Sequence, residues 1–155
     1  MNRKDEHIEG ALNQSFRQND FDEIRFLHDP LSARSVDAID VRKAFAGETF
    51  SLPVYINAMT GGSVQAYEIN KRLAMLAKHF NLPLALGSLK AGLHDQKWED
   101  SFKIAREIHP DGFIMANIGA ENSINIAKRA IELIDASLLQ IHLNPVQEMI
   151  MPEGD

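Results

Sequence analysis

The amino-acid sequence predicts an α/β protein in which parallel strands alternate with helices. Four apolar segments have strand length and are bounded by Gly, Pro, Asp or Asn; they span residues 53–59, 83–88, 113–118 and 138–144. Their first residues lie 30, 30 and 25 positions apart, and the stretches between them have helical periodicity. Repeated strand–helix units of this kind favour a parallel sheet joined by right-handed crossovers.

Composition excludes several classes of protein. The chain has 155 residues, of which 45% are hydrophobic and 25% charged, as in one ordinary globular domain. It carries 16 Lys and Arg against 22 Asp and Glu, a net charge of −6, so no basic surface for nucleic acid is expected. Cysteine is absent, which excludes disulfides and thiolate chemistry. No segment approaches the ~20 apolar residues of a membrane helix. We therefore expect a cytoplasmic protein that binds neither membranes nor nucleic acid.

Residues 1–50 are predicted to form an N-terminal extension that packs on the α/β unit of residues 51–155. The segment from Arg3 to Gln14 is polar and helical at its start. Residues 19–50 are charged, with scattered apolar side chains and a turn at Asp29-Pro30.

Three helices are expected between the strands. The first spans 63–80, with Ser63 as N-cap and Asn81 as the stop. The others span 98–108 and 122–134, and the last begins at Asn122 or Ser123. Their apolar residues recur every three or four positions, which predicts one buried face per helix. These faces comprise Ile69, Leu73, Leu76, Ala77 and Phe80; then Phe102, Ala105 and Ile108; then Ile124, Ala127, Ile131 and Ile134.

Ligands of parallel α/β proteins bind at the carboxyl ends of strands, so the residues that follow each strand are the first candidates. The first strand leads into a loop with two glycines, which suits an anion at a helix N-terminus or is a plain tight turn. The second leads into Ser88 and Lys90, which suit phosphate oxygens or belong to a solvated loop. Asn117, in the third strand, either contacts a ligand or caps its loop.

The fourth strand has the densest polar pattern. Gln140, His142 and Asn144 alternate with apolar residues and therefore share one face, and Gln147 and Glu148 follow. Because buried polar groups need partners, this pattern favours a functional polar site over a satisfied core network. The spacing of the histidines and carboxylates indicates no metal site. No Walker loop, GxGxxG or GxSxG motif is present.

A short basic cluster lies at the N-terminus of this acidic chain. Arg3 and His7 are four residues apart and would share a helical face, with Lys4 beside them. Such a cluster suits a diphosphate, because guanidinium groups match phosphate oxygens. The alternative is a frayed, solvated terminus.

Five segments, in order along the whole chain, closely resemble the type 2 isopentenyl diphosphate isomerases, which are FMN-dependent flavoproteins. The resemblance implies a (β/α)8 TIM barrel, of which this chain would form about the first four β/α units, a half-barrel behind the N-terminal extension. It also implies the interconversion of isopentenyl and dimethylallyl diphosphate in isoprenoid biosynthesis. The segments are Arg3–Ile8, Met59–Gly62, Gln140–Asn144, Gln147–Glu148 and Met151–Asp155.

The resemblance further implies cofactors and residue roles. FMN, reduced by NADPH, would act as the acid/base group, Glu148 would bind Mg²⁺, and a homo-oligomer is expected at full length. His142 and Gln147 would be catalytic, with Gln147 orienting rather than titrating. FMN would contact Ala58, Met59, Thr60, Ser88 and Asn117, and the substrate would contact Arg3, Lys4, Ser88, Lys90, Asn144 and Gln147.

Two features depart from the family pattern. Leu89-Lys90 follows Ser88 where the family commonly has Gln-Arg, so the charge is kept but one hydrogen-bonding side chain is lost. A closed barrel also needs about twice this length, so the chain corresponds to an amino-terminal half and is expected to be inactive alone. Two alternatives stay open: another FMN-binding barrel oxidoreductase, such as an α-hydroxy-acid oxidase or a dihydroorotate-dehydrogenase-like protein, and an inactive half-barrel fragment.

Overall fold

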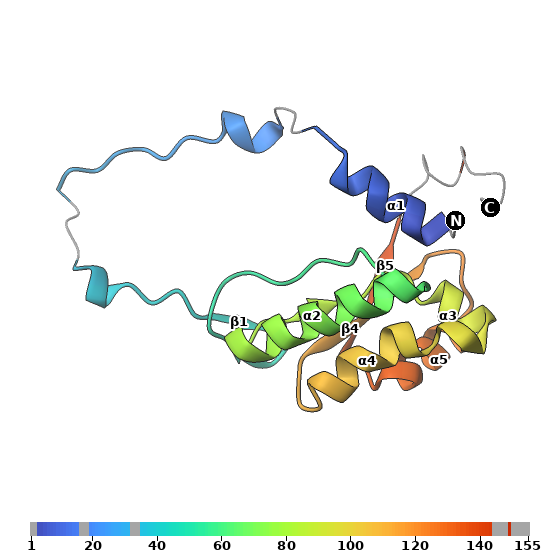
Figure 1. The fold of residues 1–155 in the computed structure, drawn as a ribbon. Coiled ribbons are helices and arrows are strands. Elements are labelled where there is room, and N and C mark those ends of the chain that lie inside the picture. Colours follow the sequence, from blue (N-terminus) through green and yellow to red (C-terminus); the bar gives the residue numbers. More distant parts are fainter. Residues whose placement is uncertain (1–2, 16–18, 32–34, 144–148, 150–155) are drawn as a thin grey trace.

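The structure is a computed structural model that describes residues 3–15, 19–31, 35–143 and 149 (Figure 1). Its strands are β1 (Lys43–Phe45), β2 (Glu48–Phe50), β3 (Leu84–Ala85), β4 (Ile114–Gly119) and β5 (Leu138–His142). Its helices are α1 (Arg3–Leu12), α2 (Val64–Phe80), α3 (Lys90–His94), α4 (Asp100–Ile108) and α5 (Ile124–Ile134). Short 3-10 turns span Asp20–Glu23, Val36–Ala38 and Gln96–Trp98.

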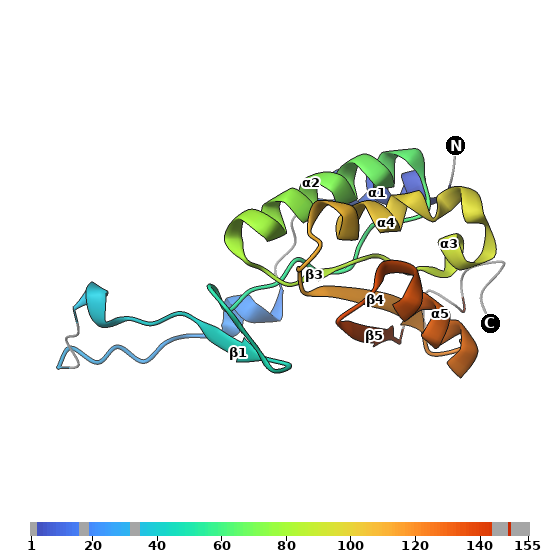
Figure 2. The same cartoon turned by 90° about the horizontal axis from the view of Figure 1, so that it is seen from below.

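The central sheet has the order β3-β4-β5, and its neighbouring strands are parallel. Side chains of the buried strand β4 alternate between two faces. Ile114, Ala116 and Ile118 pack into the core formed with α2, α4 and α5. Met115 and Asn117 therefore lie on the opposite face. Figure 2 shows α2 and α4 together on one side of the sheet.

The expected (β/α)8 half-barrel is wrong for this structure. The described residues form a small α/β domain with a three-stranded parallel sheet and a separate two-stranded antiparallel sheet, β1-β2. The predicted parallel strands are confirmed at β3, β4 and β5. Residues 51–83, which connect the hairpin to β3, add no fourth strand to this sheet.

The segment 53–59, predicted as the first strand, explains this difference. Ile56 alone forms a bridge with β3, and its N–H donates to the Pro83 carbonyl at 2.9 Å. Pro83 has no N–H with which to extend the pairing. The Asn57 side chain accepts a hydrogen bond from the Ala58 N–H at 2.9 Å. This local bond takes the place of a bond between strands.

The predicted helix ends are confirmed where capping signals are local. Ser63 accepts a hydrogen bond from the Ala66 N–H at 3.0 Å and so caps α2. Asn81 ends the same helix in the left-handed conformation, with φ of 50°. Ser123, rather than Asn122, caps α5 through the Ile126 N–H.

The buried face of α2 matches the predicted one only in part: Ala77 is fully buried and Leu73 packs against the core, as predicted. Leu76 and Phe80 are 44% and 46% exposed. Small side chains occupy the core side instead, which lets the helix pack closely against its neighbours. In α5, likewise, Ile124 is exposed. The buried residues of α2 are Ala66, Asn70, Ala74 and Ala77.

The hairpin of β1 and β2 was not predicted from the sequence. Ala46 and Gly47 form its two-residue turn, with φ of 49° and 87°. The rings of Phe45 and Phe50 pack edge-on against Phe113, with centroids 5.9 and 5.4 Å away. The hairpin therefore lies at the amino-terminal end of β4.

The N-terminal region makes few contacts with this body. In α1, Ile8 is buried. Residues 19–31 and 35–42 are exposed and pass outside the body in Figure 1. Among the described residues, none of the helices has the length and apolar character needed to cross a membrane.

Phe102 should be the most sensitive large residue of the core. Its side chain is fully buried, and a Cβ added to Gly61 would lie 2.0 Å from its ring. We expect F102A to lower the free energy of unfolding by about 3–5 kcal/mol, measured by urea denaturation. The control, F26A, removes a ring that is 96% exposed and should change stability by no more than about 0.5 kcal/mol. Equal effects of the two changes would contradict this packing.

Stability should also depend on pH through His109, at the end of α4. Burial lowers the pKa of this ring below its ordinary 6.5, and the charges of Lys78 and Arg106 add to the effect. The unfolded chain then binds the proton more readily, so the free energy of unfolding should be highest above pH 6.5 and decrease as the pH falls below it. H109Q should flatten this part of the profile, with H94Q, at an exposed histidine, as the control. A slope that H109Q leaves unchanged would refute the assignment.

Candidate functional site

Buried polar side chains from two helices hold the loop of residues 58–62. The Asn70 side chain in α2 accepts a hydrogen bond from the Thr60 hydroxyl and donates to the carbonyl oxygens of Thr60 and Ser101, at 3.3 and 2.7 Å. The Ser101 hydroxyl in α4 accepts from the Gly62 N–H at 2.9 Å. The loop is therefore fixed at the N-terminus of α2.

Close packing accounts for both glycines in this loop. A Cβ on Gly61 would overlap the Phe102 ring. Gly62 has φ of +85°, and a Cβ there would lie 2.6 Å from the Ala91 Cβ. Side chains are thus excluded at both positions by the protein itself, in keeping with the tight-turn alternative.

Backbone hydrogen bonds join this loop to the strand ends. The Gly87 N–H donates to the Thr60 carbonyl at 2.9 Å, and the Leu89 N–H donates to the Asn117 carbonyl at 2.8 Å. The loop and the carboxyl ends of β3 and β4 therefore lie along one edge, as the sequence predicted.

A polar cluster lies on the sheet face opposite the helices. Asn117 pairs with Gln140 in the register of β4 and β5. The Asn117 Nδ2 donates to Gln140 Oε1 at 2.8 Å, and its Oδ1 lies 2.8 Å from His142 Nδ1. Since an amide oxygen only accepts, His142 Nδ1 must carry the proton of this bond. The neutral ring then has Nε2 as its acceptor nitrogen.

The residues after β3, for which phosphate binding and a solvated loop were both open, lead directly into a short helix. Lys90 begins α3 and forms an ion pair with Glu121 at 3.5 Å, a partner that the sequence analysis did not single out. Leu89 is fully buried in the core. Its apolar side chain is therefore explained by packing. Ser88 is half-buried at the same edge.

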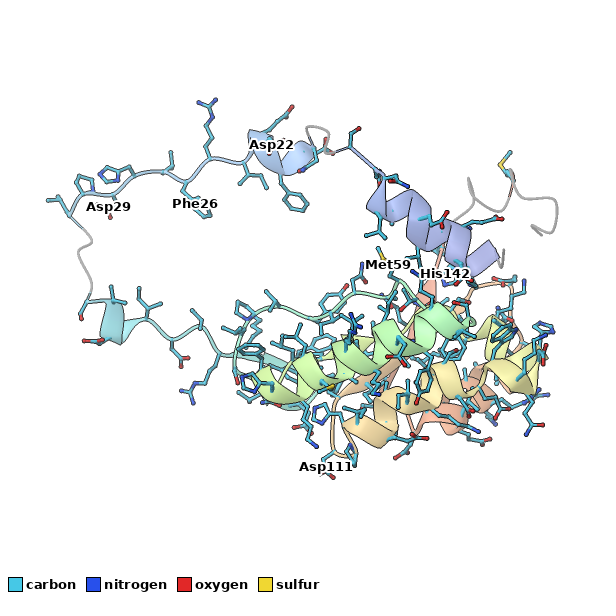
Figure 3. The ribbon with its side chains drawn as sticks, viewed as in Figure 1. Asp22, Phe26, Asp29, Met59, Asp111 and His142 are labelled. Atoms are coloured by element: carbon cyan, nitrogen blue, oxygen red, sulfur yellow. The ribbon has the colours of Figure 1, made fainter. Side chains whose placement is uncertain are left out.

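The N-terminal basic cluster reaches this edge through α1. A Cβ on Gly62 would lie 3.6 Å from the Lys4 Cγ, so Lys4 lies beside the glycine loop. Arg3 begins the same helix. In Figure 3, Met59 and His142 lie on the side of the body that α1 covers. The structure thus brings Lys4, the loop and the strand ends together.

Three predicted site residues, Asn144, Gln147 and Glu148, lie outside the described residues, as does the segment 151–155. Within the described part of the chain, no group of three or more His, Asp or Glu side chains is arranged to hold a metal ion.

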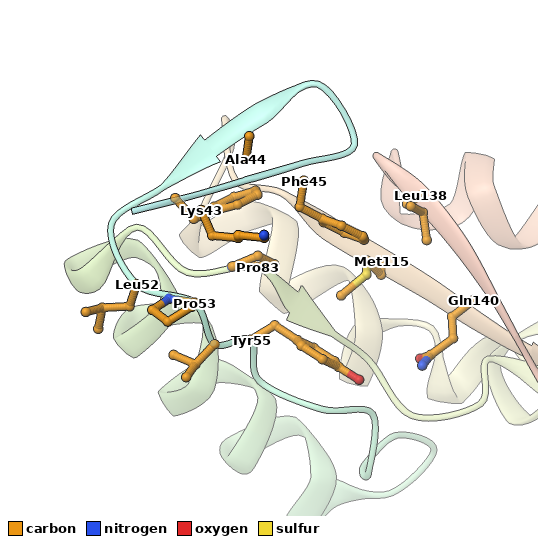
Figure 4. A pocket seen from close by; sticks show the side chains of 12 residues that line it. Lys43, Ala44, Phe45, Leu52, Pro53, Tyr55, Pro83, Met115, Leu138 and Gln140 are labelled. Atoms are coloured by element: carbon orange, nitrogen blue, oxygen red, sulfur yellow. The ribbon is translucent and has the colours of Figure 1, made fainter. Parts of the chain in front are cut away.

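A cavity of about 460 Å³ lies on the same sheet face, toward the hairpin (Figure 4). Its walls are mostly apolar and include Phe45, Tyr55, Met115 and Leu138. Gln140 lines it as well, so this side chain connects the cavity with the polar cluster.

Asn70 and Ser101 were missed by sequence analysis. Both are polar residues within predicted helices, where a solvated position is the usual expectation. The spacing of Ala66, Asn70 and Ala74 at every fourth position was the available signal, because it places Asn70 on a face of small side chains.

The hydrogen bond between Asn117 and His142 can be tested directly. Neutral His142 should be the Nδ1–H tautomer in the native chain, because Asn117 Oδ1 accepts that proton. N117L removes the acceptor and should shift the population toward Nε2–H, whereas N117D retains an acceptor oxygen. Long-range ¹H–¹⁵N NMR distinguishes the tautomers. An Nε2–H ring in the unmodified chain would mean that the Asn117 amide has the opposite orientation.

Comparisons with known proteins identify close relatives. The chain is 45% identical over 155 residues to the isopentenyl-diphosphate delta-isomerase of Latilactobacillus sakei, 44% identical over 154 residues to that of Staphylococcus haemolyticus, and 46% identical over 158 residues to that of Kitasatospora griseola. In each case 99% of this chain is matched, and it spans 43–44% of the relative's length. No family model matches the chain.

These relatives correct the resemblance drawn from the sequence. They are named isopentenyl-diphosphate delta-isomerase, and the names carry neither the type 2 designation nor FMN. The assignment to the amino-terminal half of the type 2 family is therefore replaced by the broader similarity to isopentenyl-diphosphate delta-isomerases.

Proposed function

We propose that this protein acts as an isopentenyl-diphosphate delta-isomerase, interconverting isopentenyl and dimethylallyl diphosphate. The observation that carries the proposal is similarity of 41–46% identity over 99% of the chain to proteins of that name. The chain covers less than half of their length, so the activity, the substrates and any oligomer of the whole protein are part of the proposal.

The diphosphate would bind at the edge where Lys4, the 58–62 loop and the N-terminus of α2 meet. The N-terminus of a helix favours negative charge, and a lysine beside it adds a full positive charge. The net charge of −6 would repel an anionic substrate elsewhere. Arg3 would supply the second cation.

We infer that the cofactor is FMN from the chemistry of the polar groups along the edge that the loop and the strand ends form. The side-chain amide of Asn117, the hydroxyl of Ser88 and the backbone of Ala58, Met59 and Thr60 lie along one edge, and these donors and acceptors suit a flavin ring. When bound and reduced, FMN would supply the acid/base group of the reaction. NADPH is the proposed reductant.

The residues of the chain would orient the reacting groups. Moving the double bond adds one proton at one end of the allylic unit and removes one from the other, without net redox change. His142 is held by Asn117 with Nε2 as its acceptor nitrogen, so it would position or accept a proton at that atom. Asn144 and Gln147 would contact the substrate, with Gln147 as an orienting group. Mg²⁺ is proposed on Glu148, because carboxylate oxygens suit this cation.

The activity is best tested with a chimera in which these 155 residues replace the matching segment of the L. sakei isomerase. With reduced FMN, the chimera should convert isopentenyl to dimethylallyl diphosphate, detected by NMR of the product. The parent enzyme is the positive control. A chimera that folds like its parent and shows no conversion would refute the proposed function.

The basic N-terminus provides a second test in the same chimera. R3A/K4A should raise KM for isopentenyl diphosphate at least tenfold and leave the FMN affinity unchanged, since each charge-assisted hydrogen bond contributes about 1.5–3 kcal/mol. The effect should decrease at high salt. The control is K71A/R72A, which removes another adjacent basic pair, on α2. Unchanged KM at low salt would show that the terminus does not bind the diphosphate.

A further inference from the structure

Asn70 is buried in the middle of α2, and each polar atom of its side chain has a partner. The residue is 1% exposed. Its Oδ1 accepts from the Thr60 hydroxyl, and its Nδ2 donates to two carbonyl oxygens, those of Thr60 and Ser101. One side chain thus joins the glycine loop, α2 and α4.

Ser101 completes this attachment from α4. Its hydroxyl accepts from the Gly62 N–H at 2.9 Å and donates to the Trp98 carbonyl at 2.6 Å. The side chain is 3% exposed. Two buried groups from separate helices therefore fix the backbone on both sides of Gly61.

We propose that Asn70 and Ser101 are positioning residues that hold the 58–62 loop in the single conformation that presents it to the ligand. Apolar residues would fill these buried positions at lower desolvation cost, because burying polar groups is unfavourable unless all are paired. The polar pair instead gives directional bonds to the loop backbone. A loop fixed in advance loses less entropy on binding.

The consequence for FMN rests on the function proposed above. Neither side chain needs to touch the cofactor, since each acts through Thr60 or Gly62. Their removal should therefore weaken FMN binding by loosening the loop rather than by deleting a contact.

Three variants separate this role from general stability. N70D keeps the size of the side chain but places a carboxylate oxygen against the two carbonyl oxygens that Nδ2 now contacts. S101A removes the acceptor of the Gly62 N–H together with the donor to the Trp98 carbonyl, and it leaves the Ser101 backbone carbonyl that Asn70 uses. The control is A74G, which alters a fully buried position one turn further along α2, without a bond to the loop.

Two measurements decide the proposal, the first on the chain and the second in the chimera. Amide hydrogen exchange by mass spectrometry should become at least tenfold faster for residues 60–62 in N70D and S101A, and stay within twofold of the unmodified chain in A74G. Titration of the chimera, followed by flavin fluorescence, should give a Kd for FMN that is at least tenfold higher in N70D and unchanged in A74G.

Hydrogen exchange and the Kd for FMN together distinguish a failure of the positioning role from a failure of the proposed cofactor. Unchanged exchange at residues 60–62 in N70D, or equal acceleration in A74G, would overturn the positioning role. Faster exchange with an unchanged Kd for FMN would overturn the link between the loop conformation and binding. If the chimera without these changes shows no FMN binding at any concentration, the proposed cofactor fails, while the exchange data still decide whether the two residues hold the loop.

Discussion

The alternation of side chains along β4 is the constraint on which this arrangement depends. One set of its residues, Ile114, Ala116 and Ile118, is required by the core beneath α2, α4 and α5. The other set is thereby directed to the opposite face, where Asn117 meets Gln140 and His142 of β5. A shift of one residue in register would bury the amide among apolar side chains and expose the core residues. Packing on one face of the sheet therefore fixes the polar cluster on the other.

Sequence patterns predicted the structure correctly where the signal lies within a few neighbouring residues. Ser63 and Asn81 bound α2 because caps depend on a few neighbouring residues. Gln140 and His142 share a face because a strand alternates at every residue. The partner of both, Asn117, lies 23 residues or more away. Its contacts depend on strand register, which a single sequence does not specify.

The sequence was misleading where size and context decide the structure. The predicted face of α2 is correct at Leu73 and Ala77 but wrong at Leu76 and Phe80, because small side chains permit the close packing that buries Asn70. The segment 53–59 has the composition of a strand, but Pro83 and the side chain of Asn57 prevent an extended pairing. The half-barrel that the family resemblance implied would need this segment as its first strand. Leu89, which departs from the family pattern, is instead a core residue.

The central claim is that the glycine loop and the polar cluster of β4 and β5 form one ligand site. Backbone bonds through Gly87 and Leu89 connect the two regions. Two-dimensional ¹H–¹⁵N NMR of the chimera, with ¹⁵N label in these 155 residues, during titration with FMN tests this claim most directly. The account predicts that Thr60, Gly62, Asn117 and His142 shift together along a single binding curve. Shifts confined to the cavity near Phe45 and Tyr55, or different curves for the loop and the cluster, would contradict it.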